Sequence, residues 1–485
     1  MPSRGIAKTT LAVLIIVIVI LAGAGSYYYY TTTTSTSSTT SSSSSTSSVS
    51  TTSSTTPLSG HITVAAETGY NDAALKKIAS DFMTANPGTT VTVDTLSFDT
   101  ALQSYVTTFS ANQSTYDVVF FPNVGYIGSI QQYLLDLNPY VSNTAYFPTS
   151  WNMSDILPPM IAPFQIGGHL YAIPNTGDVM LFFYRPSFFN NATDQAAFQT
   201  QYGYALPNPA TTTLTLKQTV DVANFFNGQH GSKYGIEFMT GPGDDDMIQT
   251  FLTLLGGART NTTNTALYGS VAAPYGDMFS STGKILSNTS MFQGVLSDFV
   301  QLIHASEDPD AATFTTVPGT FQAGDAPMML YWSYPILFLG NQTQGPKVYN
   351  DWAVAPTTPG GISETGGVGL GVFKYTQNLR LSLAFLEFAT TPTESVIYTT
   401  YDSLVPYRYS DFKLVPTTVL PTVIVNELLS NLKNSVQGPA NIPLWPQVST
   451  YFRTEVPNIY SGTDTVAQGA NKITSECSGQ GVPVY

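Results

Sequence analysis

The chain has 485 residues, of which 10% are charged, and 17 Lys and Arg face 31 Asp and Glu for a formal net charge of −14. A chain so poor in basic residues has no basic face, which excludes DNA or RNA binding as a function class. The single Cys477 cannot form an intramolecular disulfide and no Cys/His cluster suits zinc, so we expect no disulfide, no metal and no cofactor. Because protonating every carboxylate leaves few positive charges to repel one another, the composition indicates adaptation to an acidic exterior.

The first thirty residues have the features of a membrane anchor. The apolar stretch from Leu11 to Ala24 and its flanks, closed by four tyrosines at 27–30, give about 20 residues, enough to cross a hydrocarbon core of about 30 Å as a helix. Arg4 and Lys8 precede the stretch and no charge follows until Glu67, so the positive-inside rule leaves the N-terminus in the cytoplasm. We expect an anchor at residues 6–30 in the cytoplasmic membrane and an extracellular domain behind it.

The segment Arg4-Gly5-Ile6-Ala7 resembles the processing site of archaeal type IV pilin-like (class III) signal peptides, in which the apolar segment stays on the mature chain. This resemblance implies a leader at residues 1–5. The alternative is an ordinary secretory signal cleaved after Ala22-Gly23-Ala24.

Residues 31–59 predict an extended stalk. Every residue from Thr31 to Thr56 is Ser or Thr except Val49, and such a tract has no side chains with which to build a core. Glycan acceptor motifs of the form Asn-x-Ser/Thr agree with an exported glycoprotein, although two or three would arise by chance in so Asn- and Thr-rich a chain. They begin at Asn112, Asn152, Asn191, Asn261, Asn288 and Asn341.

The exported part opens with alternating strands and helices, and its roughly 430 residues exceed what one core supports, which predicts two lobes. We expect strands near 62–67, 91–96 and 118–121, one helix with Leu75, Ile78, Ala79, Phe82 and Met83 on one face, and a second, opened by Asp99, with Leu102, Tyr105, Val106 and Phe109. This β-α-β-α-β order predicts a parallel sheet covered by helices. Because ligands of such sheets lie beyond the carboxyl ends of the strands, Glu67–Tyr70 and Pro122–Tyr126 are placed at the predicted binding edge.

Seven motifs between Gly60 and Phe412 share their pattern and order with one family. They are Ala74–Phe82 with Asn86-Pro87-Gly88, Tyr116–Phe120, Leu134–Asn138, Gly168–Pro174 with Leu181–Tyr184, Phe321–Met329, Gly366–Val372, and Ala384–Phe388 with Val405–Arg408. The series resembles the extracellular solute-binding proteins of ABC importers, in particular the sugar-binding, maltose-binding-protein-like group known as family 1.

The resemblance implies an α/β, two-lobed periplasmic-binding-protein-like (type II) fold with parallel-rich sheets and a hinge of three crossovers between the lobes. One lobe would take residues 60–174 and 351–374, and the other residues 178–350 and 375–485. The tail after Phe412 departs from the family pattern, and we interpret it as extra helices and an irregular closing segment with Trp445 on the second lobe.

Sugar binding needs flat aromatic side chains against the C–H faces and carboxylates or amides for the hydroxyls. The resemblance places an acidic ligand group at Asp178, stacking aromatics at Trp332 and Tyr334, and close backbone approach at Gly366 and Gly367. The alternatives are a capping Asp, core aromatics and a plain turn.

Six further residues are ambiguous. Glu67 and Asn123, at strand ends, are ligand-binding candidates on topology. Asp244-Asp245-Asp246 suits either a ligand or cation contact or, as the better interpretation, an acidic helix N-terminus. Trp151 is a rim candidate or a structural residue.

The function that the resemblance implies is the substrate-binding protein of an ABC-type sugar importer, with a sugar ligand, permease subunits and a cytoplasmic ATPase as partners. No Gly-x-Ser-x-Gly or His-Glu-x-x-His motif is present, so we expect no enzymatic activity. Two alternatives stay open: a secreted glycoside hydrolase, since Glu67 and Asp178 could flank a glycosidic bond, and a pilin-like or surface adhesin with an all-β domain.

Overall fold

The computed structural model describes residues 57–485, except for 114, 124, 243–245, 261–277, 281, 341, 344–346, 403, 438–443, 483 and 485. Pro57–Tyr485 forms a compact unit of its own. The expected leader, the anchor and the stalk as far as Thr56 lie outside the described residues, as do the glycan acceptor motifs at Asn261 and Asn341 and the acidic residues Asp244 and Asp245. No helix within the described ranges is both long and apolar enough to cross a membrane.

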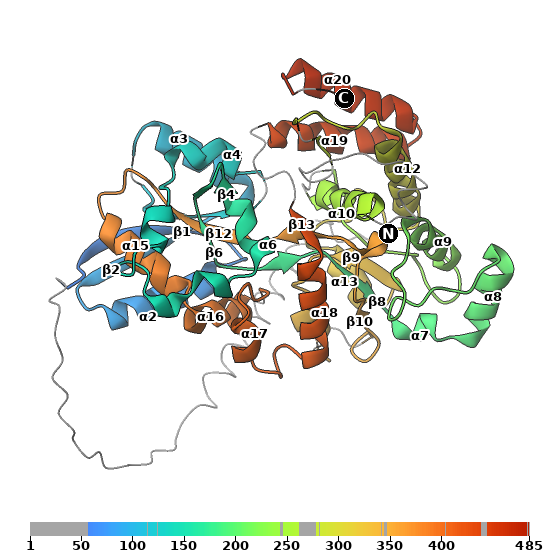
Figure 1. Ribbon diagram of the computed structural model, residues 1–485. Coiled ribbons are helices and arrows are strands. Elements are labelled where there is room, and N and C mark those ends of the chain that lie inside the picture. The colour runs from blue at the N-terminus through green and yellow to red at the C-terminus, as the bar shows by residue number, and fades with distance from the viewer. Residues whose placement is uncertain are drawn as a thin grey trace, which may run out of the picture. The chain divides into compact units, whose positions relative to one another are not determined.

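The first lobe is built on a five-stranded sheet in the order β2-β1-β3-β12-β6. The strands are β1 (Gly60–Glu67), β2 (Thr89–Leu96), β3 (Val118–Pro122), β6 (Ile173–Pro174) and β12 (Val368–Val372). β1 runs parallel to β2 and β3, and β12 runs antiparallel to β3 and β6. In Figure 1 the helices α2 (Asp72–Ala85) and α16 (Pro392–Asp402) lie below this sheet, and α3 (Phe98–Ser110) lies above it.

The opening of this lobe follows from the apolar pattern of the sequence. In α2 the side chains of Leu75, Ile78, Ala79 and Phe82 are buried because their spacing of three and four residues puts them on the face toward the sheet. The helix ends before Asn86, where Pro87 and Gly88 follow. The three expected strands, the two expected helices and the parallel pairing of the strands are confirmed.

Two segments lie in the other lobe from the one expected. Helix α15 (Leu379–Ala389) and α16 belong to the first lobe, since the ring of Phe82 meets those of Phe385 and Phe388 edge to face at centroid distances of 5.4 Å. Conversely, β10 (Ala353–Val354) pairs with the second-lobe strand β8 (Leu181–Tyr184). The expected boundaries at 351 and 375 are therefore wrong. The apolar face of α15 is buried on the first sheet, where it covers β1 and β12.

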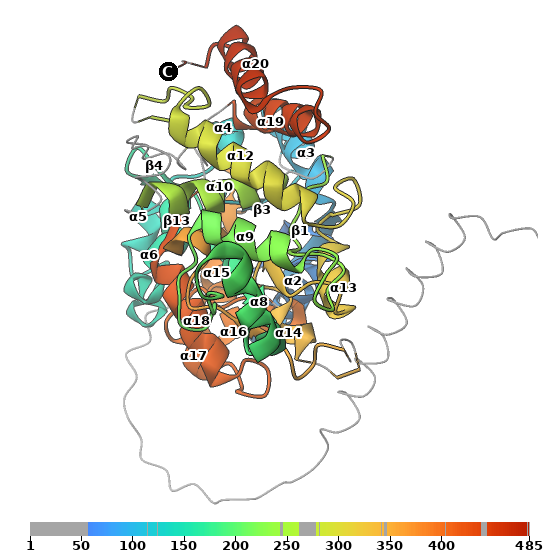
Figure 2. The same ribbon diagram turned by 90° about the vertical axis from the view of Figure 1, so that its right-hand side faces the viewer.

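The second lobe has an antiparallel sheet in the order β10-β8-β9, with β9 at Met328–Tyr331. Every residue of β8 and β9 is buried, which requires cover on both faces of the sheet. The main helices of this lobe are α9 (Leu216–Phe226), α10 (Asp246–Thr260), α12 (Ser290–His304), α19 (Trp445–Tyr460) and α20 (Val466–Gly479). Figure 2 shows α9, α10 and α12 facing the viewer, with α19 and α20 above them.

A small third sheet joins the lobes, in the order β13 (Ser435–Gln437), β11 (Ser363–Gly366) and β7 (Asp178–Val179). The strand pair β6 and β12 of the first lobe continues into the pair β7 and β11 after a short bend at residues 175–177 and at Gly367. The chain crosses again between α17 (Asp411–Leu414), which packs on α16, and α18 (Thr422–Lys433), which packs on β7 and β11. These three passages form the hinge.

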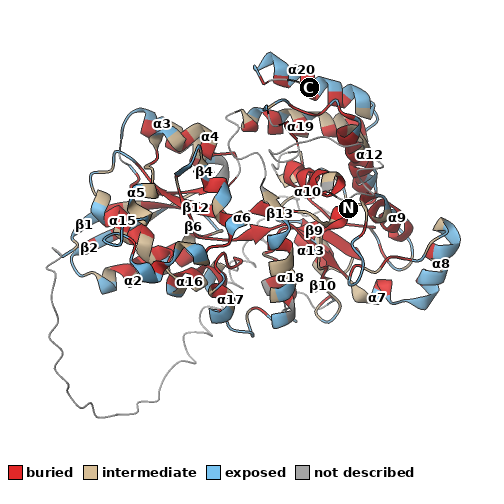
Figure 3. Cartoon of the chain, viewed as in Figure 1, coloured by how far each residue is buried: buried red, intermediate tan, exposed pale blue. Residues whose placement is uncertain are grey.

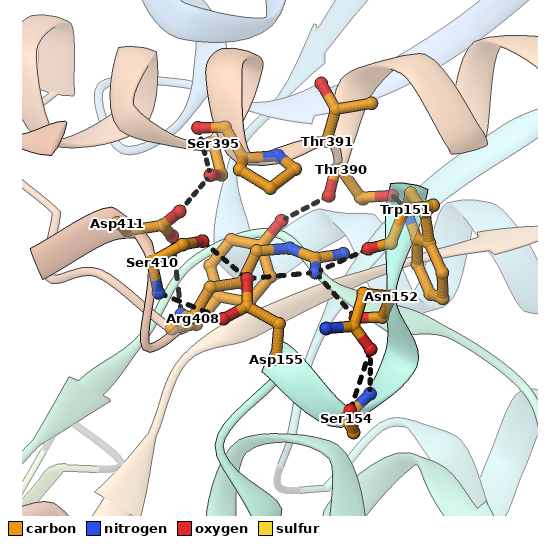
Figure 4. Close-up of polar contacts among 12 residues, drawn as sticks. Trp151, Asn152, Ser154, Asp155, Thr390, Thr391, Ser395, Arg408, Ser410 and Asp411 are labelled. Carbon is orange, nitrogen blue, oxygen red and sulfur yellow. Dashed lines mark hydrogen bonds and ion pairs between the residues drawn. The ribbon is translucent and has the colours of Figure 1, made fainter. Parts of the chain in front are cut away.

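Behind the hinge lies a buried cluster around Arg408, which is 0% exposed (Figure 4). Its Nη1 donates to the carbonyl oxygens of Trp151 at 3.0 Å and Asn152 at 3.2 Å and lies 3.6 Å from Asp155 Oδ2. The guanidinium also covers the Trp151 ring, whose Nε1 donates to Thr390 Oγ1 at 2.9 Å. Trp151 is therefore a structural residue rather than a rim residue. The cluster fixes the segment whose Val405 carbonyl accepts the amide of the hinge residue Gly177 at 2.8 Å.

The tail after Phe412 is more regular than expected. Trp445 begins the 16-residue helix α19 instead of lying in an irregular segment, and α19 packs on α20 and on the core of the second lobe. Figure 3 shows α10 and α12 mostly buried, whereas α8 (Ala192–Tyr202) and α20 present exposed faces.

The remaining elements are short. They are α4 (Ile127–Ile130), α5 (Asn138–Val141), α6 (Pro158–Ile161), α7 (Pro186–Phe189), α13 (Val317–Gln322), α14 (Ile336–Leu339), β4 (Gln165–Ile166), β5 (His169–Leu170) and the 3-10 turns Gln131–Tyr133, Thr149–Trp151, Met153–Asp155, Ala162–Phe164 and Pro359–Gly361.

Candidate functional site

A cleft of about 800 Å³ opens between the lobes and the hinge. The first lobe contributes the carboxyl ends of β1 and β3, the hinge contributes β7 and the β11–β12 turn, and the second lobe contributes the starts of α10 and α19 and the end of β9. Six of the seven residues predicted from the sequence line this cleft. They are Glu67, Asn123, Asp178, Trp332, Gly366 and Gly367.

Asp178 lies at the floor of the cleft and is 6% exposed. Its Oδ1 accepts hydrogen bonds from the amide of Ser333 at 3.0 Å, from the amide of Val179 at 2.8 Å and from the Ser333 hydroxyl. Its Oδ2 has no hydrogen-bond partner in the described part of the chain. Burial raises the pKa of Asp178 to about 6, although the bonds from Ser333 and Val179 favour the charged form.

Trp332 forms one wall of the cleft and is held from two sides. Its Nε1 donates to Asp246 Oδ1 at 2.8 Å, which fixes the plane of the indole. Gly366 lies under the ring: a Cβ there would come within 2.6 Å of Trp332 Cζ3 and 3.0 Å of Asp178 Cβ. The glycine is thus required for the indole to lie flat on the hinge strand.

Gly367 makes the turn between the hinge sheet and the first-lobe sheet. Its φ of +110° is disfavoured for other residues, and a Cβ would lie 2.7 Å from the carbonyl oxygen of Thr176. Both glycines are therefore required for the close packing of the hinge backbone.

Asn123 is committed to the hinge. It is 3% exposed, and its Nδ2 donates to the carbonyl oxygen of Thr365 at 2.6 Å while its amide donates to Gly367 O at 3.0 Å. These bonds tie the end of β3 to β11. Asn123 therefore positions the hinge and meets the cleft with its remaining surface.

Tyr334 does not line the cleft, contrary to the expectation that it would join Trp332 there. Its ring stacks on Phe314 at a centroid distance of 5.2 Å and contacts Tyr331 and Phe338. Burial raises its pKa to about 12. After β9 ends, the chain turns so that Trp332 faces the cleft, Ser333 reaches Asp178 and Tyr334 packs into the second lobe.

Sequence reasoning named Tyr70 only as part of the binding edge. Tyr70 follows β1 and lines the cleft, and its pKa is raised well above 10, first by burial and then by the charges of Asp178, Glu67 and Asp246. Its hydroxyl has one weak contact, to Thr176 Oγ1 at 3.5 Å. The phenol thus lies among carboxylates from the first lobe, the hinge and the second lobe.

Helix α19 supplies cleft residues that the sequence did not reveal, and so does the second-lobe loop that holds Asp310 and Phe314. Trp445, Thr450 and Arg453 line the cleft, and Gly125 of the first lobe lies against the Trp445 ring, because a Cβ there would be 3.0 Å from Trp445 Cδ1. Trp445 is 1% exposed, and its Nε1 has no partner in the described ranges. Only its residue type, one of four tryptophans, could have marked it as a candidate.

The cleft has the chemistry of a site for a polar, ring-shaped solute. Flat apolar surfaces come from Trp332 and Phe314, and acceptors come from Glu67 and Asp178 among other carboxylates. Among the described residues no group of three acidic, histidine or cysteine side chains could hold a metal ion.

Comparison with known proteins gives both a family and a fold. The family model for the bacterial extracellular solute-binding protein matches residues 65–395. No curated protein sequence matches the chain.

Solved structures share the fold at low identity. The maltose-bound MalE3 of T. maritima has a TM-score of 0.65 at 19% identity and covers 87% of this chain and 99% of its own. The sugar-binding protein MalE of Xanthomonas citri has a TM-score of 0.66 at 17% identity and covers 86% and 96%. An ABC transporter solute-binding protein of Agrobacterium radiobacter in complex with ribitol has a TM-score of 0.66 at 18% identity and covers 87% and 100%. With two thirds of its length matched by the family model and this two-lobed fold, the chain belongs to the bacterial extracellular solute-binding protein family.

Proposed function

We propose that this protein captures a sugar or a related polyol outside the cell between its two lobes and delivers it to the permease of an ABC importer driven by a cytoplasmic ATPase. The observation that carries the proposal is the cleft itself, in which aromatic faces and carboxylates from both lobes converge beside a hinge.

A sugar fits this chemistry. The indole of Trp332 covers an apolar ring face, and Asp178 Oδ2 and Glu67 accept hydrogen bonds from the hydroxyls. Gly366 and Gly367 let the ligand approach the hinge backbone closely. Three structural neighbours have maltose, ribitol and alpha-D-tagatose bound, which are a disaccharide, a polyol and a monosaccharide.

Capture of the ligand closes the cleft. Because residues of both lobes line it, a bound solute contacts both lobes at once and favours the closed state over the open one. The permease then recognises the closed protein. The N-terminal helix, residues 6–30, holds the receptor at the membrane, and the Ser/Thr stalk supplies the reach. The Asn residues of the motifs at Asn112, Asn152, Asn191 and Asn288 are exposed and so accessible to glycosylation.

A thermal-shift and calorimetric screen tests the proposal. The full-length chain, in a detergent without a sugar headgroup, is titrated with mono-, di- and oligosaccharides and polyols. A ligand at 100 times its Kd adds about 2.7 kcal/mol to the free energy of unfolding, so a binder raises the melting temperature measurably. A saturable shift without product formation supports a receptor. Hydrolysed product would instead make the carboxylates of the cleft catalytic, and a screen without any binder would contradict the proposal.

A further inference from the structure

We propose that the cleft selects its ligand by charge: it takes neutral and amine-bearing sugars or polyols and rejects those that carry a carboxylate, phosphate or sulfate. This inference rests on the proposed function and narrows its substrate class.

Acidic side chains surround the cleft. Glu67 comes from the first lobe, Asp178 from the hinge, and Asp246 and Asp310 from the second lobe. A charged ligand between the lobes is therefore within a short distance of carboxylates on every side, where water screens poorly. The formal net charge of −14 adds a repulsive field for anions that approach from solution.

No basic side chain is arranged to compensate. Among the described residues that line the cleft, Arg453 is the only Lys or Arg. Its guanidinium is turned to its own lobe, where Nη1 donates to the carbonyl oxygen of Pro242 at 3.0 Å and Nε to Ser449 Oγ at 3.3 Å. A site for a carboxylate or phosphate ligand would instead present a guanidinium fork or an ammonium to it.

Asp178 gives the selection a local contact. Its side chain is more than nine-tenths buried, Oδ1 is occupied by Ser333 and Val179, and Oδ2 lacks a partner among the described residues. An acceptor of this kind is satisfied by a hydroxyl or an ammonium group of a ligand, whereas an anionic oxygen would leave it unpaired and repelled.

Isothermal titration of the full-length chain at pH 7 and low salt tests the inference with matched probes. Glucose, glucosamine, glucuronate and glucose 6-phosphate form one series, and galactose, maltose and ribitol with their amine, carboxylate and phosphate counterparts form others. We expect the neutral or amine member of a series to bind and its anionic counterpart to bind at least about tenfold more weakly, a gap that high salt narrows. An anionic member that binds as tightly as its neutral counterpart overturns charge selection but leaves sugar binding standing. If no member of any series binds, both charge selection and sugar binding are overturned.

Charge variants locate the source of the gap. The double substitution Asp246→Asn with Asp310→Asn keeps the oxygen acceptors for Trp332 Nε1 and the Tyr460 hydroxyl while it removes two charges from the cleft. We expect it to reduce the neutral-to-anionic affinity ratio several-fold. Glu476→Gln, on the exposed face of α20, is the control and should leave the ratio unchanged. An unchanged ratio in the double variant would show that the second-lobe carboxylates, Asp246 and Asp310, do not contribute to the selection.

Discussion

At the scale of single residues, Trp332 is the position that the proposed function needs most. Trp332→Phe keeps a buried aromatic ring but loses the outer ring and the bond to Asp246. We expect the affinity for the bound sugar to fall by about 1–3 kcal/mol, measured by titration calorimetry. Tyr334→Phe changes a neighbouring ring outside the cleft and should leave the affinity unchanged. Equal affinities for both variants would remove Trp332 from the site.

Arg408 is the residue on which we expect the stability of the hinge to depend. Arg408→Met removes a fully buried cation and leaves Asp155 without its charge partner and the carbonyls of Trp151 and Asn152 without their donor. The loss of one partner from a buried pair costs about 3–5 kcal/mol of unfolding free energy, which urea denaturation measures.

The control for Arg408 removes the same charge from the surface. Lys413→Met, in the nearby helix α17, takes away an exposed cation and should change stability by less than about 0.5 kcal/mol. A similar loss in both variants would mean that net charge, and not the buried cluster, determines the effect.

The residues that sequence reasoning found differ in kind from those that it missed. Asp178 and Gly366 lie on the hinge strands, Gly367 lies in the turn between β11 and β12, and Glu67 and Asn123 lie at strand ends, where topology alone places a ligand. Tyr334 was misplaced because Trp332, Ser333 and Tyr334 lie in a turn, whose side-chain directions follow no period.

At the scale of elements, the periodicity of the sequence predicted features that depend on neighbouring residues in the chain. The face of α2 follows from the spacing of its own apolar residues, and the parallel pairing of the strands on either side of it follows from the β-α-β order. The apolar face of α15 is equally clear, but nothing within 379–389 states which sheet it covers, and the contact of Phe385 with Phe82 spans 300 residues of sequence. Assignment of a helix to a lobe therefore needed the structure.

Helix α19 brings the two lobes into contact at the cleft. It belongs to the second lobe and begins with Trp445, against Gly125 of the first lobe. Trp445→Phe replaces the indole with a smaller ring and so weakens this contact. We expect the closed state to lose population and the sugar Kd to rise several-fold.

Electron spin resonance distances between the lobes measure the effect of Trp445→Phe. Spin labels on exposed positions, Ser110→Cys in the first lobe and Gln199→Cys in the second, report the opening, because the native Cys477 is buried and burial raises the pKa of its thiol to about 12. Trp352→Phe, a substitution of the same kind away from the cleft, serves as the control. Identical distance distributions in the two variants would contradict a role for α19 in closure.

At the scale of the whole molecule, buried acids link stability to pH. Burial, with the charge of Glu307 added, raises the pKa of Glu237 to about 9, and burial raises the pKa of Glu387, Asp402 and Asp411 to about 7. Asp136 opposes this trend: burial favours its neutral form, but bonds from His169 and the Asn138 amide outweigh it and lower its pKa. Among the described acids whose pKa departs from its usual value, more have a raised pKa than a lowered one. The raised groups therefore determine whether the free energy of unfolding rises or falls with pH.

This linkage makes the folded protein more stable in acid than at neutral pH. In the unfolded chain these carboxyls titrate near pH 4, so between about pH 4 and pH 7–9 the folded state holds protons that the unfolded state has released. The stabilisation is fully present below the unfolded pKa and is lost as pH rises through the folded pKa. We expect the free energy of unfolding to fall by at least about 3 kcal/mol between pH 4.5 and pH 8, as measured by urea denaturation at each pH. Glu237→Gln, which cannot ionise, should make the free energy of unfolding depend less on pH. A stability that rises with pH in the unmutated chain would contradict both the raised pKa values of the buried acids and the adaptation to an acidic exterior that the low charge content indicates.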